Sequence, residues 1–218
     1  GPVVIDVPDD IQRADVDVES LRHFEAPTFD RTVIGESFIA SRPIIAFGWG
    51  VHLAGARQKA WDMVTRFGVP CVTTWGAADI MVGHPLYVGT WGTHGVRAAN
   101  FAVQNADLVI AIGTRLDTKA TGSPSSSFAP KAQLVMVDVD EAELKKMPLI
   151  GRSCLMRQED ALSYMQNLRI NGDFTEWLLK ISTWRNAYPA ILPSYGPENP
   201  YRIMEELGRY LTTDDVVV

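Results

Sequence analysis

The sequence has little that would place it in a membrane, on a nucleic acid or in a disulfide framework. Its 218 residues include only two cysteines, and no CxxC motif contains either of them. No apolar run approaches the roughly 20 residues that a helix needs to cross a bilayer. Acidic residues (26) outnumber Lys and Arg (20), which disfavours a surface that binds a phosphate backbone. We therefore expect neither a membrane nor a nucleic acid as a partner.

The scarcity of cysteine also bears on the compartment. Cys71 lies within an apolar run and is predicted to be a small core residue. Two free thiols and the absence of a charged-then-apolar signal pattern fit a reducing environment. We expect a cytoplasmic protein.

What the sequence does contain is an alternation of strand-like and helix-like segments. With 46% hydrophobic and 21% charged residues, the composition is that of an ordinary globular protein. Several apolar runs carry no polar alternation, as is typical of parallel strands that are covered on both faces. Strand–helix alternation predicts right-handed βαβ units, and hence an α/β, doubly wound (Rossmann-like), mostly parallel sheet with helices on both faces. The predicted strands are 44–47, 70–74, 107–113 and 134–140, and the predicted helices are 32–41, 54–67 (closed by Gly68), 96–105, 158–168, 173–187 and 201–211.

Both ends of the chain read as pieces of larger units. Residues 1–8 and the final run of valines are strand-like, yet neither has an evident partner strand nearby, and an unpaired strand is costly to bury. The simplest interpretation is an internal piece of a longer polypeptide. The second of the late helices carries Trp177, Ile181 and Trp184 on one stripe, which is more typical of core or interdomain packing than of a cofactor site.

In an open α/β sheet, ligands bind beyond the carboxyl ends of the strands, so each strand end is a candidate site. The first is Gly48-Trp49-Gly50, where the third glycine of a dinucleotide fingerprint would fall on Leu53. An acidic residue about 20 positions later is also missing, so a plain NAD site is disfavoured. The alternative is simply a tight strand-to-helix turn that requires glycine.

The second candidate end runs from Gly113 to Lys119. Arg115 and Lys119 there would place two cations beside a pyrophosphate, where charge-assisted contacts contribute roughly 1.5–3 kcal/mol each. The alternative is a surface ion pair between Arg115 and Asp117, which would stabilise the fold little.

Two further strand ends carry polar side chains. Asp138-Val139-Asp140 sets two carboxylates on one side, so that one would accept a hydrogen bond from a ribose or adenine and the other would cap the next helix. His94 lies in a glycine-rich loop before a helix, where it would contact a ligand or only support the loop. No spacing predicts a metal site or a catalytic constellation.

Taken together and in order, these segments resemble one family. They are GPVVIDVP, RPII…GWG, GVPCVTT, HPL…GTWGTHG, AN…ADLVIAIGTRLD, FAPKA and VDVD, and they span residues 1–147. The chain resembles the thiamine-diphosphate-dependent enzymes of the acetolactate synthase type.

The resemblance implies a division of the chain into parts of three domains. Thiamine diphosphate and Mg²⁺ would bind in the flanking domains, so no catalytic residue is expected here, and this piece alone should be inactive. The parts are the last strand of an N-terminal pyrimidine-binding domain (1–8), a linker (9–31), a central nucleotide- or FAD-binding domain (32–170), a helix with a linker (171–200) and the start of a C-terminal pyrophosphate-binding domain (201–218).

The resemblance also assigns cofactor-binding residues in the central domain, where FAD, ADP or neither would bind. Two positions depart from the family pattern: Trp49 stands where glycine is usual, and Lys119 where a second arginine is usual. The implied contacts are Gly48, Trp49, Gly50, Thr74, Trp75 and His94 around the ribityl and ADP parts of FAD, Gly113, Thr114, Arg115, Asp117 and Lys119 beside the pyrophosphate, and Asp138 and Val139 beside the adenosine.

The expected parent enzyme decarboxylates a 2-oxo acid such as pyruvate and transfers the two-carbon unit to an acceptor, as a homodimer or homotetramer. A sister lyase of the oxalyl-CoA decarboxylase type is a close alternative. A non-catalytic nucleotide-binding subunit and a structural spacer with a vestigial site are further alternatives.

Overall fold

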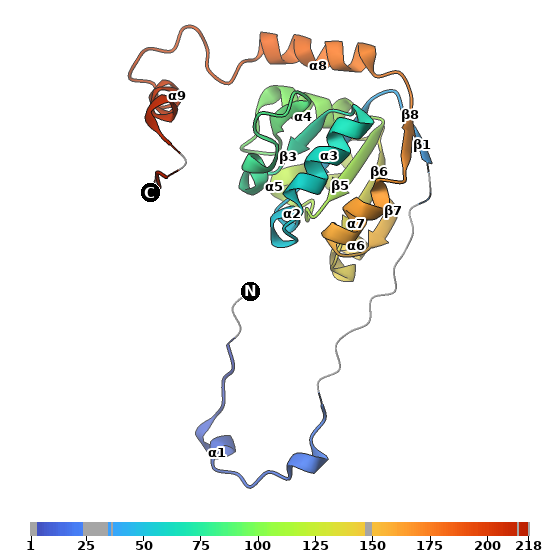
Figure 1. Ribbon diagram of the computed structural model, residues 1–218, viewed down its shortest axis with the longest axis vertical. Helices are drawn as coiled ribbons and strands as arrows, with labels where there is room; N and C mark the ends of the chain where they lie inside the picture. The colour runs from blue at the N-terminus through green and yellow to red at the C-terminus, as the bar shows by residue number, and fades with distance from the viewer. Residues whose placement is uncertain (1–3, 24–34, 36, 147–149, 213, 218) are drawn as a thin grey trace.

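A computed structural model describes residues 4–23, 35, 37–146, 150–212 and 214–217 of the chain (Figure 1). Its central strands are apolar on both faces, as their sequences predict. β2 (Pro43–Phe47) and β5 (Leu108–Ile112) are buried at every residue, and β6 (Gln133–Asp138) at every residue but the first. Such strands need a covering layer on each side of the sheet.

The main sheet is parallel throughout and has six strands in the order β4-β3-β2-β5-β6-β7. The outer strands are β3 (Cys71–Thr73), β4 (Tyr87–Thr90) and β7 (Ile150–Leu155). The chain builds outward from β2 to β4, then crosses back and builds outward from β5 to β7. The order therefore reverses between β2 and β5, which is the switch point where doubly wound folds bind ligands.

Helices cover both faces of the sheet, so a hydrophobic core lies on each face. Successive side chains of a strand enter these two cores in turn. Ile45 and Phe47 of β2 face α3 (Arg57–Phe67) and α7 (Gln158–Met165), whereas Ile44 and Ala46 face α4 (Arg97–Asn105) and α8 (Thr175–Ala187). This confirms the doubly wound fold. Shorter elements are α2 (Gly50–Leu53), α5 (Thr118–Thr121), α6 (Glu141–Lys146) and the 3₁₀ turns η2 (Trp75–Met81) and η3 (Ser125–Ser127).

The tryptophan stripe of α8 packs on the sheet domain. Trp177 is 3% exposed, and its Nε1 donates a hydrogen bond to the carbonyl oxygen of Pro43 at 3.0 Å. The Trp184 ring meets the Trp177 ring edge-on, with centroids 5.7 Å apart. The stripe therefore serves as core packing, one of the two roles that its spacing predicts.

Two helix predictions are wrong in detail. Instead of a helix over 32–41, Ser37–Ile39 form β1, which pairs in parallel with β8 (Arg169–Asn171); residues 32–34 and 36 lie outside the described residues. The partner strand lies far along the chain, so local periodicity could not reveal it. The predicted helix 54–67 begins later, because Gly55, at φ +59°, separates α2 from α3. Gly68, at φ +62°, does close α3 as predicted.

Two strands of the main sheet were not predicted. β4 lies within residues 76–95, which contain five glycines, two histidines and a proline, and its Gly89 has φ +132°. β7 contains Gly151 and Arg152 and pairs on one side only, so it lacks the unbroken apolar run of a central strand. The predicted helix over 158–168 likewise ends at Met165, and the chain soon enters β8.

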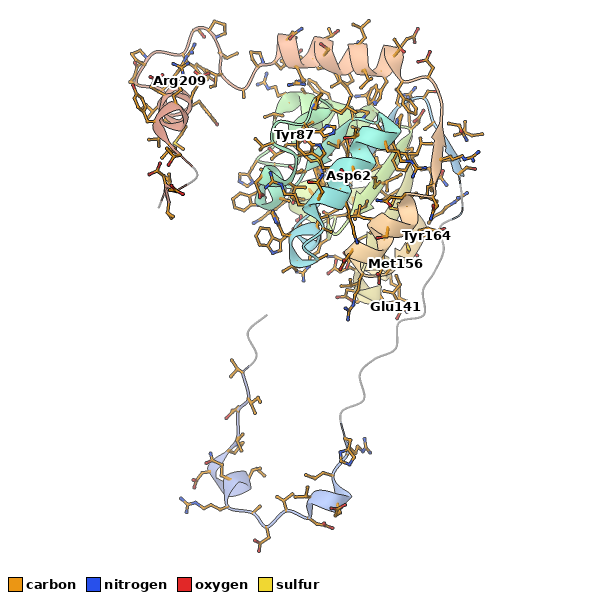
Figure 2. All side chains as sticks on the ribbon, in the orientation of Figure 1. Asp62, Tyr87, Glu141, Met156, Tyr164 and Arg209 are labelled. Atoms are coloured by element: carbon orange, nitrogen blue, oxygen red, sulfur yellow. The ribbon has the colours of Figure 1, made fainter. Side chains whose placement is uncertain are left out.

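The strand-like ends form no strand among the described residues. Residues 4–8 and 214–217 have no sheet partner there. The predicted linker holds α1 (Asp9–Gln12) and a 3₁₀ turn, η1 (Val18–Ser20), while residues 24–31 lie outside the described part. α9 (Pro200–Tyr210) is capped by Asn199 and carries local ion pairs such as that of Arg209 (Figure 2), but none of its side chains is buried.

In the described part of the chain, no helix is long and apolar enough to cross a membrane.

His84 is a buried titratable group whose ring meets the Trp61 ring of α3 edge-on. Its Nδ1 accepts a hydrogen bond from the Leu86 amide at 3.1 Å, and its Nε2 lies 3.0 Å from the Thr65 hydroxyl. That hydroxyl donates to the carbonyl of Trp61, so it accepts from Nε2–H. The arrangement suits neutral imidazole, and burial lowers the pKa of His84.

We expect His84 to make the fold less stable in mild acid. The unfolded chain binds a proton with a pKa near 6.5, whereas the folded chain resists it. The free energy of unfolding therefore falls as the pH drops from that value through the lowered folded pKa. Urea unfolding at about pH 7.5 and about pH 5.5 checks this. His84→Gln should show a smaller pH-dependent loss than the wild type, and equal losses in both proteins would contradict the assignment.

Candidate functional site

The carboxyl ends of the strands enclose a cavity of about 810 Å³, within the 300–1,000 Å³ typical of small-molecule sites. All thirteen residues predicted to bind a cofactor line this one cavity. They are Gly48, Trp49, Gly50, Thr74, Trp75, His94, Gly113, Thr114, Arg115, Asp117, Lys119, Asp138 and Val139. The structure thus brings together residues that lie up to 91 positions apart in the sequence.

At the switch point, two backbones meet with no room for a side chain. Gly48 donates to the carbonyl of Ile112 at 2.9 Å, and Gly50 donates to that of Gly113 at 3.0 Å. A Cβ at Gly48 would overlap the Gly113 carbonyl oxygen and lie 2.6 Å from Thr114 Cβ. Glycine is required here for packing between the two turns, which supports the tight-turn interpretation of Gly48-Trp49-Gly50.

One side of the cavity is aromatic. Trp49 and Trp75 are 54% and 67% exposed although both line the cavity. The His94 ring stacks on Trp75, with centroids 5.5 Å apart and an angle of 27° between the planes. Trp49 lies against the backbone side of Gly76, whose ideal Cβ would be 3.9 Å from Trp49 Cε3. Two large rings, each more than half exposed, therefore line the cavity.

The loop that carries His94 is fixed from both sides. The Asn100 side chain accepts from the Gly92 amide at 2.7 Å and donates to the Gly92 carbonyl at 3.0 Å. The Thr93 amide donates to the carbonyl of Lys119 at 2.8 Å. Asn100 thus holds the loop that in turn contacts α5. Only the asparagine in the first turns of a predicted helix could have hinted at this role.

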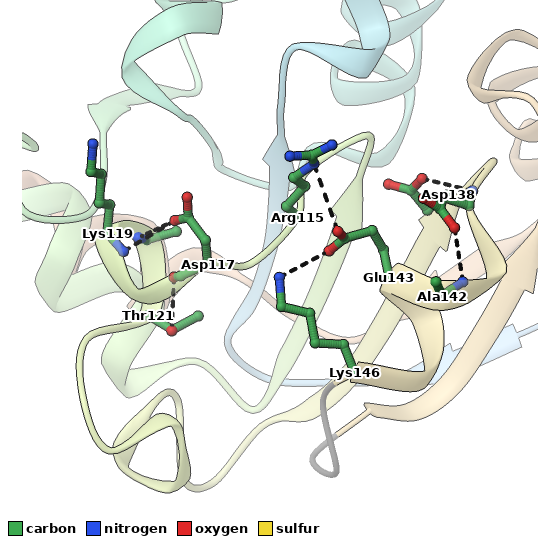
Figure 3. Close-up of polar contacts among 10 residues, drawn as sticks. Arg115, Asp117, Lys119, Thr121, Asp138, Ala142, Glu143 and Lys146 are labelled. Atoms are coloured by element: carbon green, nitrogen blue, oxygen red, sulfur yellow. Dashed lines mark hydrogen bonds and ion pairs between the residues drawn. The ribbon is translucent and has the colours of Figure 1, made fainter.

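The opposite side of the cavity is ionic (Figure 3). Arg115 Nε lies 3.7 Å from Glu143 Oε1, and Lys146 Nζ lies 3.2 Å from Glu143 Oε2. Asp117 instead caps α5, accepting from the amides of Lys119 and Ala120 at 3.1 Å each. The alternative of an Arg115–Asp117 surface pair is therefore wrong, because helix capping engages the Asp117 carboxylate and Glu143 reaches Arg115 from α6.

Backbone strain also occurs at this edge. Gly113 has φ +62°, and Leu116, which is 3% exposed, has φ +49°. A left-handed conformation costs a non-glycine residue roughly 1–2 kcal/mol. The turn after β5 keeps this conformation because Leu116 is buried in the core between the sheet and helices α4 and α8, and Asp117 caps α5.

Asp138 and Asp140 have different roles, and one of the two caps the next helix, as the sequence predicts. Asp140 accepts from the Ala142 amide at 2.8 Å and so caps α6. Asp138 is 7% exposed and accepts from the Asp140 amide at 3.0 Å. Burial raises the pKa of Asp138, which makes its carboxyl sensitive to any hydrogen-bond donor brought into the cavity.

Sequence reasoning missed several residues of the lining. Some stand next to predicted ones, whereas Glu143 comes from α6, Arg157 precedes α7 and Glu159 lies in its first turn. Arg157 and Glu159 follow the carboxyl end of β7, which was not among the predicted strands, so no predicted strand end marked them. The missed residues are Leu53, Ala54, Gly76, Trp91, Thr93, Leu116, Ala120, Asp140, Glu143, Arg157 and Glu159.

Comparison with known protein families agrees with this geometry. Residues 39–154, more than half of the chain, match the family described as "Thiamine pyrophosphate enzyme, central domain". The matched range contains every strand of the main sheet except the last residue of β7. This chain belongs to the thiamine pyrophosphate enzyme family.

Relatives of this chain include acetolactate synthase large subunits. It is 31% identical to a probable acetolactate synthase large subunit of Methanococcus aeolicus, over 95% of this chain and 39% of that protein. It is 30% identical to the isozyme 1 large subunit of Escherichia coli K12 (98% and 40%) and 26% identical to the large subunit of Lactococcus lactis (100% and 40%). The chain spans about 40% of the length of these relatives.

Within the described residues of this family member, no group of three or more His, Cys, Asp and Glu side chains could hold a metal ion.

We expect Gly48→Ala to damage the cavity floor. The new methyl group would meet backbone atoms of Gly113 and Thr114, which cannot rotate away, so the variant should lose roughly 1–3 kcal/mol of stability. Urea unfolding measures this loss.

Gly76→Ala is the matched control, because its Cβ would make only an ordinary contact with Trp49. Equal stability of the two variants would show that the close approach of β2 and β5 does not constrain Gly48.

Proposed function

We propose that this chain is the central domain of a thiamine-diphosphate-dependent 2-oxo-acid decarboxylase and carboligase of the acetolactate synthase type, and that its cavity binds FAD or ADP. The family match and the acetolactate synthase relatives support the enzyme class. The observation that carries the nucleotide assignment is the convergence of all thirteen predicted residues on one cavity at the switch point.

The residues present fit such a ligand. Gly48, Gly50 and Gly113 leave a floor without side chains, so a diphosphate can approach the backbone closely, although the amides of all three already donate to carbonyl oxygens. Arg115 is 75% exposed and has only a long contact to Glu143, so it can turn toward a phosphate.

In this proposal the residues of the chain bind and orient the nucleotide, and none of them contacts the reacting atoms of the substrate. Asp138 would accept hydrogen bonds from ribose hydroxyls, and Arg115 and Lys119 would neutralise the diphosphate. By the resemblance, FAD here has a largely structural role. Its expected effect is to tie the turns after β2, β3, β5 and β6 together.

The same proposal assigns the remaining segments. Residues 1–8 would be the last strand of a pyrimidine-binding domain, 9–31 and 171–200 connecting segments around the central domain, and 201–218 the start of a pyrophosphate-binding domain. Thiamine diphosphate and Mg²⁺ would bind in those flanking domains. The parent would be a cytoplasmic homodimer or homotetramer acting on a 2-oxo acid such as pyruvate.

We expect Arg115→Ala to weaken nucleotide binding at least ten-fold. A hydrogen bond from a charged donor is worth about 1.5–3 kcal/mol, and its loss would raise the dissociation constants of both FAD and ADP. Calorimetric titration of the full chain measures both constants.

Arg185→Ala, an exposed arginine of α8 outside the cavity, is the control and should bind both ligands as the wild type does. If Arg115→Ala binds as tightly as the control, the phosphate lies elsewhere. If neither FAD nor ADP binds the wild-type chain, the nucleotide assignment fails.

A second test concerns the parent. Mass spectrometry of the native product, captured from its source cells with an antibody to this segment, should detect a polypeptide more than twice the length of this chain. Peptides of thiamine-binding domains should occur on both sides of it. A native product of 24.1 kDa would instead favour a non-catalytic nucleotide-binding subunit.

A further inference from the structure

We propose that a second cavity, at the amino ends of the strands, binds the phosphate group of a small molecule through Arg42, Lys131 and Lys180. This amino-end cavity measures about 680 Å³ and shares no lining residue with the cavity at the carboxyl ends. The two sites are therefore independent of one another.

The amino-end cavity lies between the edge of the main sheet and α8. Arg42 directly precedes β2, and Lys131 lies two residues before β6. The opposite wall is a stripe of α8 at helical spacing that includes Glu176, Lys180 and Trp184. The three cations therefore come from three separate segments, and they line both walls of the cavity.

The Arg42 guanidinium is held in place by its neighbours. Its Nε donates a hydrogen bond to the carbonyl oxygen of Asn105 at 2.8 Å. The amides of Ser41 and Arg42 donate to the Asp107 carboxylate at 2.9 and 2.8 Å, which fixes the backbone as well. The two terminal nitrogens of the guanidinium have no partner in the described part of the chain. Such a pair of nitrogens can bind two oxygens of one phosphate in parallel.

Lys180 is positioned too, because its Nζ lies 5.5 Å from the centre of the Trp184 ring, within the range of a cation–π contact. That ring is itself packed against Trp177, a core residue. Neither Lys180, Arg42 nor Lys131 pairs with a described carboxylate. Three like charges around one cavity repel one another, and a bound anion would remove that repulsion.

Two carboxylates also line the amino-end cavity, but neither neutralises these cations. Asp173 accepts a hydrogen bond from the Thr175 amide at 2.9 Å, so its carboxylate supports the start of α8. Glu176 has no hydrogen bond or ion pair with any described residue. Its charge would oppose a bound anion, which makes it a useful position for a test.

Three cations on two walls suit a phosphate group better than a carboxylate. A phosphate monoester presents three oxygens and about 1.5–2 negative charges at neutral pH. A carboxylate presents only two oxygens and one charge. Arg42 would bind two phosphate oxygens, and Lys131 and Lys180 would act as point charges beside them. A phosphate held in this way would join α8 to the turns that precede β2 and β6.

Titration of the full chain with inorganic phosphate tests the site. Calorimetry in chloride buffer at constant ionic strength should show saturable binding, with a dissociation constant on the order of 1 mM. Arg42→Lys should weaken this binding about ten-fold, because lysine cannot make the parallel pair of hydrogen bonds. Lys131→Ala should weaken it about five-fold, since it removes a more exposed charge.

Glu176→Gln should have the opposite effect and tighten phosphate binding about two-fold, because it removes a negative charge from the wall. A damaged fold would not produce such a gain. Arg185→Ala is the matched control, since it removes an exposed cation of α8 that lies outside the cavity, and it should bind phosphate as the wild type does. Lys131 and Glu176 are both exposed, so these two variants decide the question if Arg42→Lys fails to fold.

Two outcomes would overturn the proposal. The first is that the wild-type chain shows no saturable binding of phosphate. The second is that Arg115→Ala abolishes binding while Arg42→Lys and Lys131→Ala keep it, which would place the phosphate in the cavity at the carboxyl ends. Failure of the FAD and ADP titrations would not affect the amino-end cavity, because the two cavities have no residue in common.

Discussion

The close approach of two backbones, where β2 and β5 end, is the constraint on which the rest of the structure depends. Gly48 packs on Gly113 and Thr114 with no space for a methyl group, and hydrogen bonds from Gly48 and Gly50 tie the two turns together. Because the two central strands pair along their whole length, this contact fixes where the turns after β2 and β5 begin. The cavity is the space left above that contact.

Much of this arrangement is readable in the sequence because central parallel strands leave a strong signal. β2 and β5 are unbroken apolar runs followed directly by glycine, and β6 contains an apolar run that ends at Asp138, so both the sheet and its ligand-binding edge could be predicted. Gly113 and Asp138 could be assigned to the cavity for the same reason. A strand that is buried on both faces needs apolar residues at nearly every position, so its sequence is easy to recognise.

The remaining strands and side-chain contacts could not be predicted because they depend on residues that lie far apart in the sequence. β7 and β8 each pair with another strand on one side only, so tertiary partners rather than composition decide where they form. Glu143 reaches Arg115 only because α6 folds back over the end of β6, and Asp117 is drawn away from that arginine by its helix cap. Charges in a sequence show which pairs are possible, and only the fold selects among them.

The register between β2 and β5 also determines how occupancy of the cavity relates to folding. The residues that pair across this contact, such as Ile44 and Val109, lie 65 positions apart, so the two central strands meet only after a long loop has closed. No local segment of the chain can form the cavity on its own. A ligand that fills it binds only the assembled domain, and at a hundred times its dissociation constant it would add about 2.7 kcal/mol to the free energy of unfolding. The free energy of unfolding of the domain in a cell would then depend on the concentration of that ligand.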